Sequence, residues 1–348
     1  MLASTRPSAS KAPCFARPRG AVEALTSEFG SLEGVASALL EAQSLVICGH
    51  ISPDGDCIGS QLGLAHALRS LGKQVTCLLA HDEPIDYGLR FLPGASELVP
   101  ASQFQGSFDT FVTVDVPAAA RLGEDAAALH AGAAHTVTVD HHLFKTPLSQ
   151  AYYVDSQAPS CSMIIWQLVE LLGAPRTPEV ALCCYTGLVT DTGGFSFQNT
   201  NAQALRFAAG MVEAGARPDL VAREVFQNRS LASLELQKVM LGRMSISEDG
   251  VSAISYLTLA DFQELGAVKA DAEPLINVLR SVRGIRVACI LREQEDCVRG
   301  SLRAKDDTDV ASIANRLGGG GHRAAAGFTF HGTLAQAREA VAIELSAL

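Results

Sequence analysis

The chain has 348 residues, of which 48% are hydrophobic, and its formal net charge is −10. This length favours two domains, each able to bury an ordinary core. The apolar runs fall well short of the ~20 residues that a membrane helix needs, so we expect a soluble protein with no membrane partner. The acidic balance argues against a duplex-DNA binder that relies on counterion release.

The nine cysteines include no C-x-x-C pair. We therefore expect reduced, buried thiols and a cytoplasmic location rather than disulfides. The charge is unevenly spread, with 12 basic against 27 acidic residues over 21–268 and 10 against 8 over 269–323. An acidic metal-binding half and a mildly basic half would suit a small anionic substrate, although solvated surface explains the charges equally well.

Residues 1–20 contain four basic residues, no acidic ones, and several Ser, Ala and Pro. This composition fits a transit peptide, a disordered tail or a misassigned start, and we exclude the segment from the fold.

Predicted strands and helices alternate over the first half of the chain. Apolar periodicity and runs rich in Val and Thr predict the following elements in order: a helix at 32–43, a strand at 45–49, a helix from about 58, strands at 74–79, 108–116 and 135–140, and helices at 161–172 and 178–189. This alternation predicts an α/β domain with a doubly wound, mainly parallel sheet. Ligands of such sheets gather beyond the carboxyl ends of the strands.

The rest of the chain predicts a smaller α/β domain. Residues 201–244 are helical with short breaks, and we place the boundary in the last of these helices. A strand pair near Gly250, a helix at 273–282, strands at 287–292 and 298–303, a helix at 310–317, a strand at 325–330 and a final helix follow. The predicted domains are a catalytic domain at 21–229, a linker helix at 230–244 and a substrate-binding domain at 245–348.

Four short motifs offer metal ligands. They are His50-x-x-x-Asp54-x-Asp56, Asp115, Asp140-His141-His142 and Asp191, and each follows a predicted strand or helix. Carboxylate together with imidazole suits Mn²⁺, Mg²⁺ or Zn²⁺. Too many acids for one ion suggest two metals that share a bridging carboxylate, an arrangement used to direct water at phosphorus.

Taken singly, most of these motifs have a structural explanation. Asp54 could belong to an Asp-Gly turn, Asp115 could cap a helix before Pro117, and Asp191 could be a cap or a turn. Asp140-His141-His142, directly after a β run, is more specific. The order and setting of the four together favour the metal site.

The four motifs resemble those of the DHH phosphoesterases. Gly300-Ser301-Leu302-Arg303 and the run Gly318 to Gly321 with His322 resemble the DHH-associated C-terminal domain. The resemblance covers the chain from about residue 21 and is best to the nanoRNase/pAp-phosphatase branch. It implies an active site in the cleft between the two domains.

The resemblance also implies roles for single residues. One divalent cation would be held by His50, Asp54 and Asp115. The second would be held by Asp56, Asp115, His141 and Asp191, so that Asp115 bridges the pair. His142 would contact the scissile phosphate, and Asp140 would orient His141 or its neighbour. Both ions would be Mn²⁺, with Mg²⁺ as the alternative.

The glycine run and its neighbours are the predicted substrate contacts. Consecutive glycines can approach a ligand closely and present N–H groups to an anion, although a helix C-cap would need one of them. Arg303 could fork onto the phosphate that is not cleaved. The predicted contacts are Ser301, Arg303, Gly318, Gly319, Gly320, Gly321 and His322.

The resemblance implies a hydrolase that cuts short oligoribonucleotides to mononucleotides and converts 3′-phosphoadenosine 5′-phosphate (pAp) to AMP and phosphate. Two alternatives stay open: a phosphodiesterase for cyclic dinucleotides or linear pApA, and a nucleotide sensor with an inactive site. Missing ligands would support the sensor, and none of the six is missing. Apolar helices in the first domain permit a homodimer as well as ordinary core packing.

Overall fold

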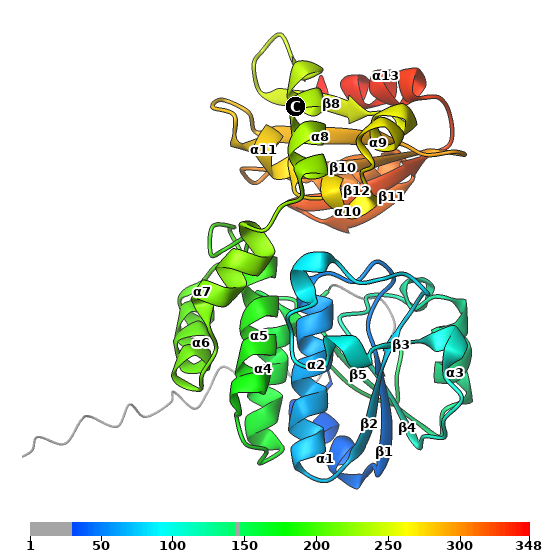
Figure 1. The fold of residues 1–348 in the computed structure, drawn as a ribbon, viewed down its shortest axis with the longest axis vertical. Coiled ribbons are helices and arrows are strands. Elements are labelled where there is room, and N and C mark those ends of the chain that lie inside the picture. Colours follow the sequence, from blue (N-terminus) through cyan, green and yellow to red (C-terminus); the bar gives the residue numbers. More distant parts are fainter. Residues whose placement is uncertain (1–29, 143–146) are drawn as a thin grey trace, which may run out of the picture. The chain divides into compact units, whose positions relative to one another are not determined.

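A computed structural model describes residues 30–142 and 147–348, apart from the side chain of His322 (Figure 1). The predicted tail at 1–20 lies outside the described residues. The chain divides into two compact units, Met1–Val225 and Phe226–Leu348, which are described separately.

The first unit is built on a parallel six-stranded sheet with the order β3-β2-β1-β4-β5-β6. Ile47 of β1 pairs with Cys77 of β2 on one side and with Val112 of β4 on the other. The strand order therefore reverses at β1 and β4, the switch point at which doubly wound sheets bind ligands. The strands are β1 (Ser44–Cys48), β2 (Gln74–Leu79), β3 (Val99–Pro100), β4 (Thr110–Val114), β5 (His135–Asp140) and β6 (Ala151–Val154).

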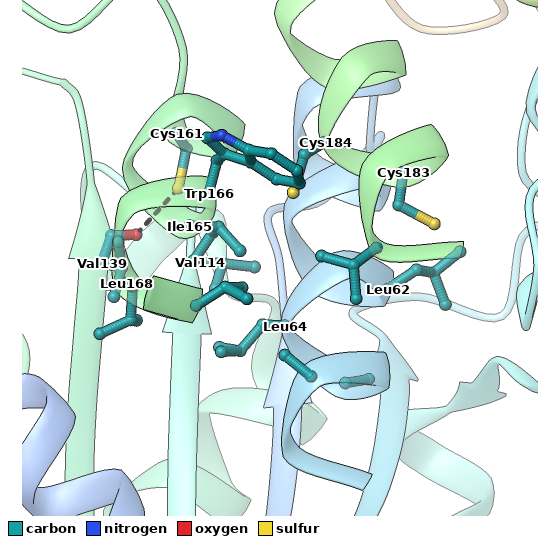
Figure 2. Close-up of a cluster of buried hydrophobic side chains, with 14 of the residues drawn as sticks. Leu62, Leu64, Val114, Val139, Cys161, Ile165, Trp166, Leu168, Cys183 and Cys184 are labelled. Carbon is teal, nitrogen blue, oxygen red and sulfur yellow. Dashed lines mark hydrogen bonds between the residues drawn. The ribbon is translucent and has the colours of Figure 1, made fainter. Parts of the chain in front are cut away.

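Helices cover both faces of this sheet. Leu45 and Ile47 belong to a large core beneath one helical layer, whereas Val46 and Cys48 face the smaller core on the α3 side. The large layer contains α1 (Leu32–Glu41), α2 (Gly55–Ser70), α4 (Cys161–Leu171), α5 (Pro178–Asp191) and α6 (Ala202–Glu213), and the other side has α3 (Glu124–Gly132). Figure 2 shows side chains of α2, α4 and α5, Trp166 among them, gathered over Val114 and Val139.

The second unit has a mixed six-stranded sheet with the order β11-β12-β10-β9-β8-β7. Only β8 and β9 are parallel in this sheet. Its strands are β7 (Ser245–Ile246), β8 (Ser252–Leu257), β9 (Val287–Glu293), β10 (Val298–Ala304), β11 (Gly319–His322) and β12 (Ala325–Phe330). Its helices are α8 (Leu231–Gly242), α9 (Leu259–Leu265), α10 (Lys269–Ala272), α11 (Leu275–Ser281), α12 (Val310–Arg316) and α13 (Leu334–Leu345). Two short helical segments, α7 (Pro218–Val221) and η5 (Ala222–Phe226), precede them in the chain, where the first unit ends.

Alternate residues of the second sheet face different helices. Leu302 of β10 and Cys289 of β9 pack in a core with α12 and α13. Ile290 of β9 packs in a second core with α8 and α11. The predicted helix at 230–244 corresponds to α8, whose Leu236 and Met240 are buried in that second core.

The predicted α/β architecture is confirmed, and the strands at 74–79, 135–140 and 325–330 have the predicted bounds. The glycine run contains a strand that the sequence did not predict, because Gly319 to Gly321 form part of the edge strand β11. Pairing with β12 overrides the poor strand propensity of glycine. Among the described residues, no helix is both long and apolar enough to cross a membrane.

Close packing of α2 against α5 depends on Gly59. A Cβ atom at this position would lie 2.5 Å from the Cys183 carbonyl oxygen and 3.0 Å from the Gly187 nitrogen. We predict that Gly59→Ala lowers the free energy of unfolding by about 1–3 kcal/mol through overpacking. In α6, a Cβ at Gly210 would meet no atom within 4 Å, so Gly210→Ala should be neutral or stabilising. Urea unfolding of both variants tests this, and equal effects would contradict it.

Candidate functional site

The four motifs converge at the carboxyl edge of the first sheet. His50 follows β1 and Asp115 follows β4, the two strands at which the order reverses. Asp140 ends the next strand, β5, and the two histidines follow it directly. Asp56 lies in the first turn of α2, and Asp191 is the last residue of α5.

Asp115 lies at the centre of the cluster. Its Oδ2 is 3.5 Å from Nε2 of His50, and its Oδ1 is 3.4 Å from Nε2 of His141 and 3.4 Å from Nδ1 of His142. The side chain is 2% exposed, and Oδ1 is buried without a hydrogen-bond partner. The backbone is left-handed, with φ +59°, a conformation that Asp tolerates better than most residues. Each oxygen of this carboxylate therefore faces a different imidazole.

Backbone carbonyl groups fix the orientation of two imidazole rings. Nδ1 of His50 donates to the Ile51 carbonyl oxygen at 2.8 Å, and Nδ1 of His141 donates to the Ala158 carbonyl oxygen at 3.2 Å. A carbonyl oxygen can only accept, so Nδ1 bears the proton in both rings. In each neutral ring this directs the Nε2 lone pair toward the carboxylates, the usual arrangement of metal-binding histidines.

Asp56 is held by the N-terminus of α4. Its two oxygens accept hydrogen bonds from the backbone N–H groups of Cys161, at 2.6 Å, and Ser162, at 2.9 Å. A helix N-terminus stabilises a carboxylate, which keeps this buried acid available to a cation. Oδ2 of Asp56 also lies 3.7 Å from Nε2 of His141. Sequence reasoning missed these two contacts, because they join residues 105 and 106 positions apart.

Asp191 and Asp54 differ in their surroundings. Oδ2 of Asp191 is 3.7 Å from Nε2 of His141, at the end of α5, where the helix dipole disfavours a carboxylate. Asp54 is the N-cap of α2, and its Oδ1 accepts from the backbone N–H groups of Asp56 and Cys57. The same oxygen is 3.9 Å from Nε2 of His50. Asp54 thus caps a helix at the margin of the cluster, with a side chain that is 61% exposed.

Asp140 organises the two histidines that follow it. Its Oδ1 accepts from Nδ1 of His142 at 2.8 Å and from the backbone N–H groups of His141, at 2.7 Å, and His142, at 3.1 Å. This carboxylate therefore fixes the His142 ring directly and the His141 ring through its backbone. The two rings lie edge to face, with centroids 4.7 Å apart.

Two residues near the cluster were not anticipated from the sequence. Cys57 is buried and offers its sulfur to a group with His50 and Asp115, although burial raises the pKa of its thiol well above the usual value. Nη2 of Arg121 lies 3.1 Å from Nδ1 of His50. Because that nitrogen already donates to Ile51, it cannot also accept a hydrogen bond from Arg121.

The crowding of charge perturbs the ionisation of the cluster. Burial would lower the pKa of His50, but Asp115 and Asp54 outweigh it and raise the pKa to about 9. Burial, together with Asp115, raises the pKa of Asp56 to about 6. Burial would raise the pKa of Asp115, yet His141 and His50 hold it well below its usual value. A divalent cation would replace the protons on the imidazoles and relieve the repulsion among the acids.

The donor set fits two divalent cations. Three overlapping groups have ligand atoms within 4.8 Å of one another: His50 with Cys57 and Asp115, Asp115 with His141 and His142, and Asp56 with His141 and Asp191. Asp115 occurs in two of them and His141 in two. Oxygen and imidazole nitrogen are the ligands of Mn²⁺ and similar ions. The buried Oδ1 of Asp115 has no hydrogen-bond partner and could coordinate such a cation.

The predicted substrate contacts of the second unit lie on β10 and β11, apart from Gly318, which directly precedes β11. Ser301 and Arg303 are partly exposed and alternate with the buried Leu302. The hydroxyl of Ser301 accepts from Nη2 of Arg292 at 2.8 Å, so its own proton remains available to another acceptor. Arg292, which is 8% exposed, is held by Glu273 through its Nη1 at 2.6 Å.

The glycines of this region fall into two groups. A Cβ at Gly319 would lie 2.1 Å from the Gly327 carbonyl oxygen, and a Cβ at Gly321 would lie 2.7 Å from the Ala325 carbonyl oxygen. Packing therefore demands glycine there, and Gly318 has a φ of +87° that favours it. At Gly320 and Gly327 the nearest atom to a Cβ would be 3.4 Å away. The side chain of His322 lies outside the described residues.

Comparison with known proteins supports this reading of the motifs. Residues 44–188 match the family model of the DHH family, N-terminal domain, and residues 253–346 match the DHHA1 domain. The chain is 32% identical over 300 residues to the Thermus thermophilus protein named bifunctional oligoribonuclease and PAP phosphatase NrnA, covering 85% of this chain and 87% of that protein. The chain belongs to the DHH family.

Other DHH relatives extend the comparison. A Bacillus subtilis protein with the same NrnA name is 25% identical and covers 83% of this chain and 90% of its own length. A crystal structure of an exopolyphosphatase-related protein from Bacteroides fragilis superposes with a TM-score of 0.84 at 27% identity, covering 93% of this chain and 98% of that one. This DHH protein therefore lies in the branch that contains the proteins named NrnA.

We predict that Mn²⁺ binding strengthens as the pH rises. The proton on His50, whose pKa is raised from 6.5 to about 9, competes with the cation for Nε2. The apparent affinity should therefore increase from pH 6.5 toward pH 9, and binding at neutral pH should release protons. Calorimetric titrations in two buffers of different ionisation heat measure both effects. A pH-independent affinity would exclude proton competition at His50.

We predict that Asp115→Ala loses both ions, because the one carboxylate lies against His50 and His141. Metal analysis after dialysis against Mn²⁺ should find about two ions per chain in the natural protein and nearly none in the variant. Asp219→Ala, which removes an exposed carboxylate paired with Arg217, is the matched control and should keep its metal. One ion retained by Asp115→Ala would contradict the shared ligand.

Proposed function

We propose that this protein is a two-metal phosphoesterase that hydrolyses short oligoribonucleotides to mononucleotides and pAp to AMP and phosphate. The observation that carries the proposal is the buried Asp115 carboxylate, whose Oδ2 faces the imidazole of His50 and whose Oδ1 faces that of His141. The relatives named NrnA are bifunctional oligoribonucleases and PAP phosphatases by name, and the chain spans most of their length. Every ligand predicted from the motifs is present in the sequence.

The proposed ligand sets follow the distances in the cluster. One cation is held by His50, Asp115 and the second oxygen of Asp54, since Oδ1 of Asp54 caps α2. The other is held by Asp56, His141, Asp191 and Asp115. Mn²⁺ is the proposed ion, because Mg²⁺ prefers all-oxygen, water-rich coordination and this site supplies two imidazoles.

The chain positions the reacting groups around these ions. When bound, the metals lower the pKa of water for attack on phosphorus and neutralise charge on the phosphate oxygens. We propose that His142, which is held by Asp140 at 2.8 Å and is 21% exposed, contacts the scissile phosphate. The α4 N-terminus holds Asp56 through two backbone N–H groups, and the carbonyl groups of Ile51 and Ala158 orient the rings of His50 and His141 through Nδ1.

The second unit supplies the proposed anchor for the substrate. The partly exposed Ser301 and Arg303 can bind a phosphate that is not cleaved, with the Ser301 hydroxyl oriented by Arg292. Gly320 and Gly327 pair across β11 and β12, and the fold has room for a Cβ at either position. We propose that glycine there keeps the backbone accessible to the ligand, with Gly318, Gly319, Gly321 and His322 completing the anchor. The substrates are short single strands, and duplex DNA is not expected among them.

The test is product analysis with Mn²⁺ on pAp, pApA and a five-residue RNA. We predict AMP from pAp and pApA, mononucleotides from the RNA, and no turnover by Asp115→Ala. Arg303→Ala should raise KM for pAp more than it lowers kcat, because it removes an interaction that is equally strong in the substrate complex and in the transition state. Turnover of pApA alone would favour the dinucleotide phosphodiesterase. Metal binding without turnover of any of the three would refute the proposed activity.

A further inference from the structure

A third residue of β10 shares the face of Ser301 and Arg303. Residues two apart in a strand point to the same side, and Val298 and Leu302, which alternate with these three residues along β10, face the core with α12 and α13. Arg299 is therefore on the side of Ser301 and Arg303, and it is the exposed member of the three. Thr329 and the exposed Gly327 of β12 pair with Arg299 and Ser301, so the same face continues across β12.

Arg299 lies opposite another positively charged residue in the sheet. Arg299 is paired in register with Arg292 of β9, and like charges directly opposite one another destabilise a sheet. Arg292 is neutralised by Glu273, whereas Arg299 donates to the neutral hydroxyl of Thr329 at 2.6 Å. Within residues 30–142 and 147–348, no carboxylate oxygen lies within 4.0 Å of Arg299. A local conflict of this kind is typical of a functional position.

The spacing along β10 relates these side chains to substrate length. Four residues of strand separate Arg299 from Arg303, which is on the order of 13 Å. That distance exceeds a single phosphate-to-phosphate step of a nucleotide chain. Under the proposed function, one phosphate of pAp would be cleaved and the other would bind at Arg303, which would leave no phosphate for Arg299. A longer strand has further phosphates that can extend along the face.

We propose that Arg299 is a phosphate contact that engages oligoribonucleotides but not pAp, and so raises the preference of this protein for the longer substrates. The inference rests on the proposed function, since it assumes that the face of β10 anchors the substrate. Guanidinium forks bind phosphate well, and hydrogen bonds to charged groups contribute more than neutral ones.

The kinetic test compares Arg299→Ala with Arg299→Lys on pAp and on a five-residue RNA. We expect the alanine variant to lose roughly tenfold in kcat/KM on the RNA and less than about twofold on pAp. The lysine variant should retain most of the RNA activity, because it keeps the charge. The control is Arg338→Ala, which removes an arginine of α13 that lies over the Tyr256 ring. This variant should leave both activities unchanged. Equal losses on the two substrates, or none, would overturn the proposal.

A binding test distinguishes failure of this inference from failure of the proposed function. Asp115→Ala provides a background in which the RNA is not consumed. There, the slope of log affinity against log salt for the five-residue RNA should fall by about 0.7 when Arg299 becomes Ala, and should stay unchanged with Lys. An unchanged slope in the alanine variant refutes the contact even if the enzyme cleaves RNA. A reduced slope in a protein that cleaves neither substrate refutes the activity and retains the contact.

Thermal unfolding provides a structural control. Because Arg299 opposes Arg292, Arg299→Ala should leave the Tm unchanged or slightly raised. A marked drop in Tm would make Arg299 a structural residue and would overturn its assignment as a phosphate contact.

Discussion

One buried carboxylate, Asp115, organises the rest of the first unit. It lies at the end of a central strand, 2% exposed, with an imidazole within 3.5 Å of each of its oxygens. Taking an acid out of water costs several kcal/mol unless opposite charge surrounds it. Asp115 bears this cost, and its left-handed backbone conformation adds a second one, because the residue is not glycine. Such a position is understandable if its normal partners are cations.

The surrounding acids lie in different electrostatic environments, and their positions at helix ends explain the difference. Asp56 accepts two N–H groups from the start of α4, which favours its charge. Asp191 is at the end of α5, where burial raises its pKa well above the usual value and the dipole adds no help. Asp140 accepts three N–H groups and orients a ring. Acids at helix ends and strand ends thus acquire separate roles from their positions rather than from their residue type.

Sequence reasoning predicted the parallel sheet and the convergence of the motifs, because strands that end in an acid or a histidine meet at one edge. It could not predict that Asp56 faces the N-terminus of α4 or that Arg292 holds Ser301, since such contacts depend on the packing of separate elements. It predicted no strand at the glycine run, where the structure has β11. Glycine has low strand propensity, and only pairing with β12 reveals which of these glycines the fold requires.

The central claim is that two cations share Asp115. Diffraction from crystals grown with Mn²⁺, recorded at the manganese absorption edge, tests it most directly. We expect two anomalous peaks about 3.5–4 Å apart, one beside His50 and one beside His141, with Asp115 in contact with both. A single peak, or two peaks of which one does not touch Asp115, would contradict it.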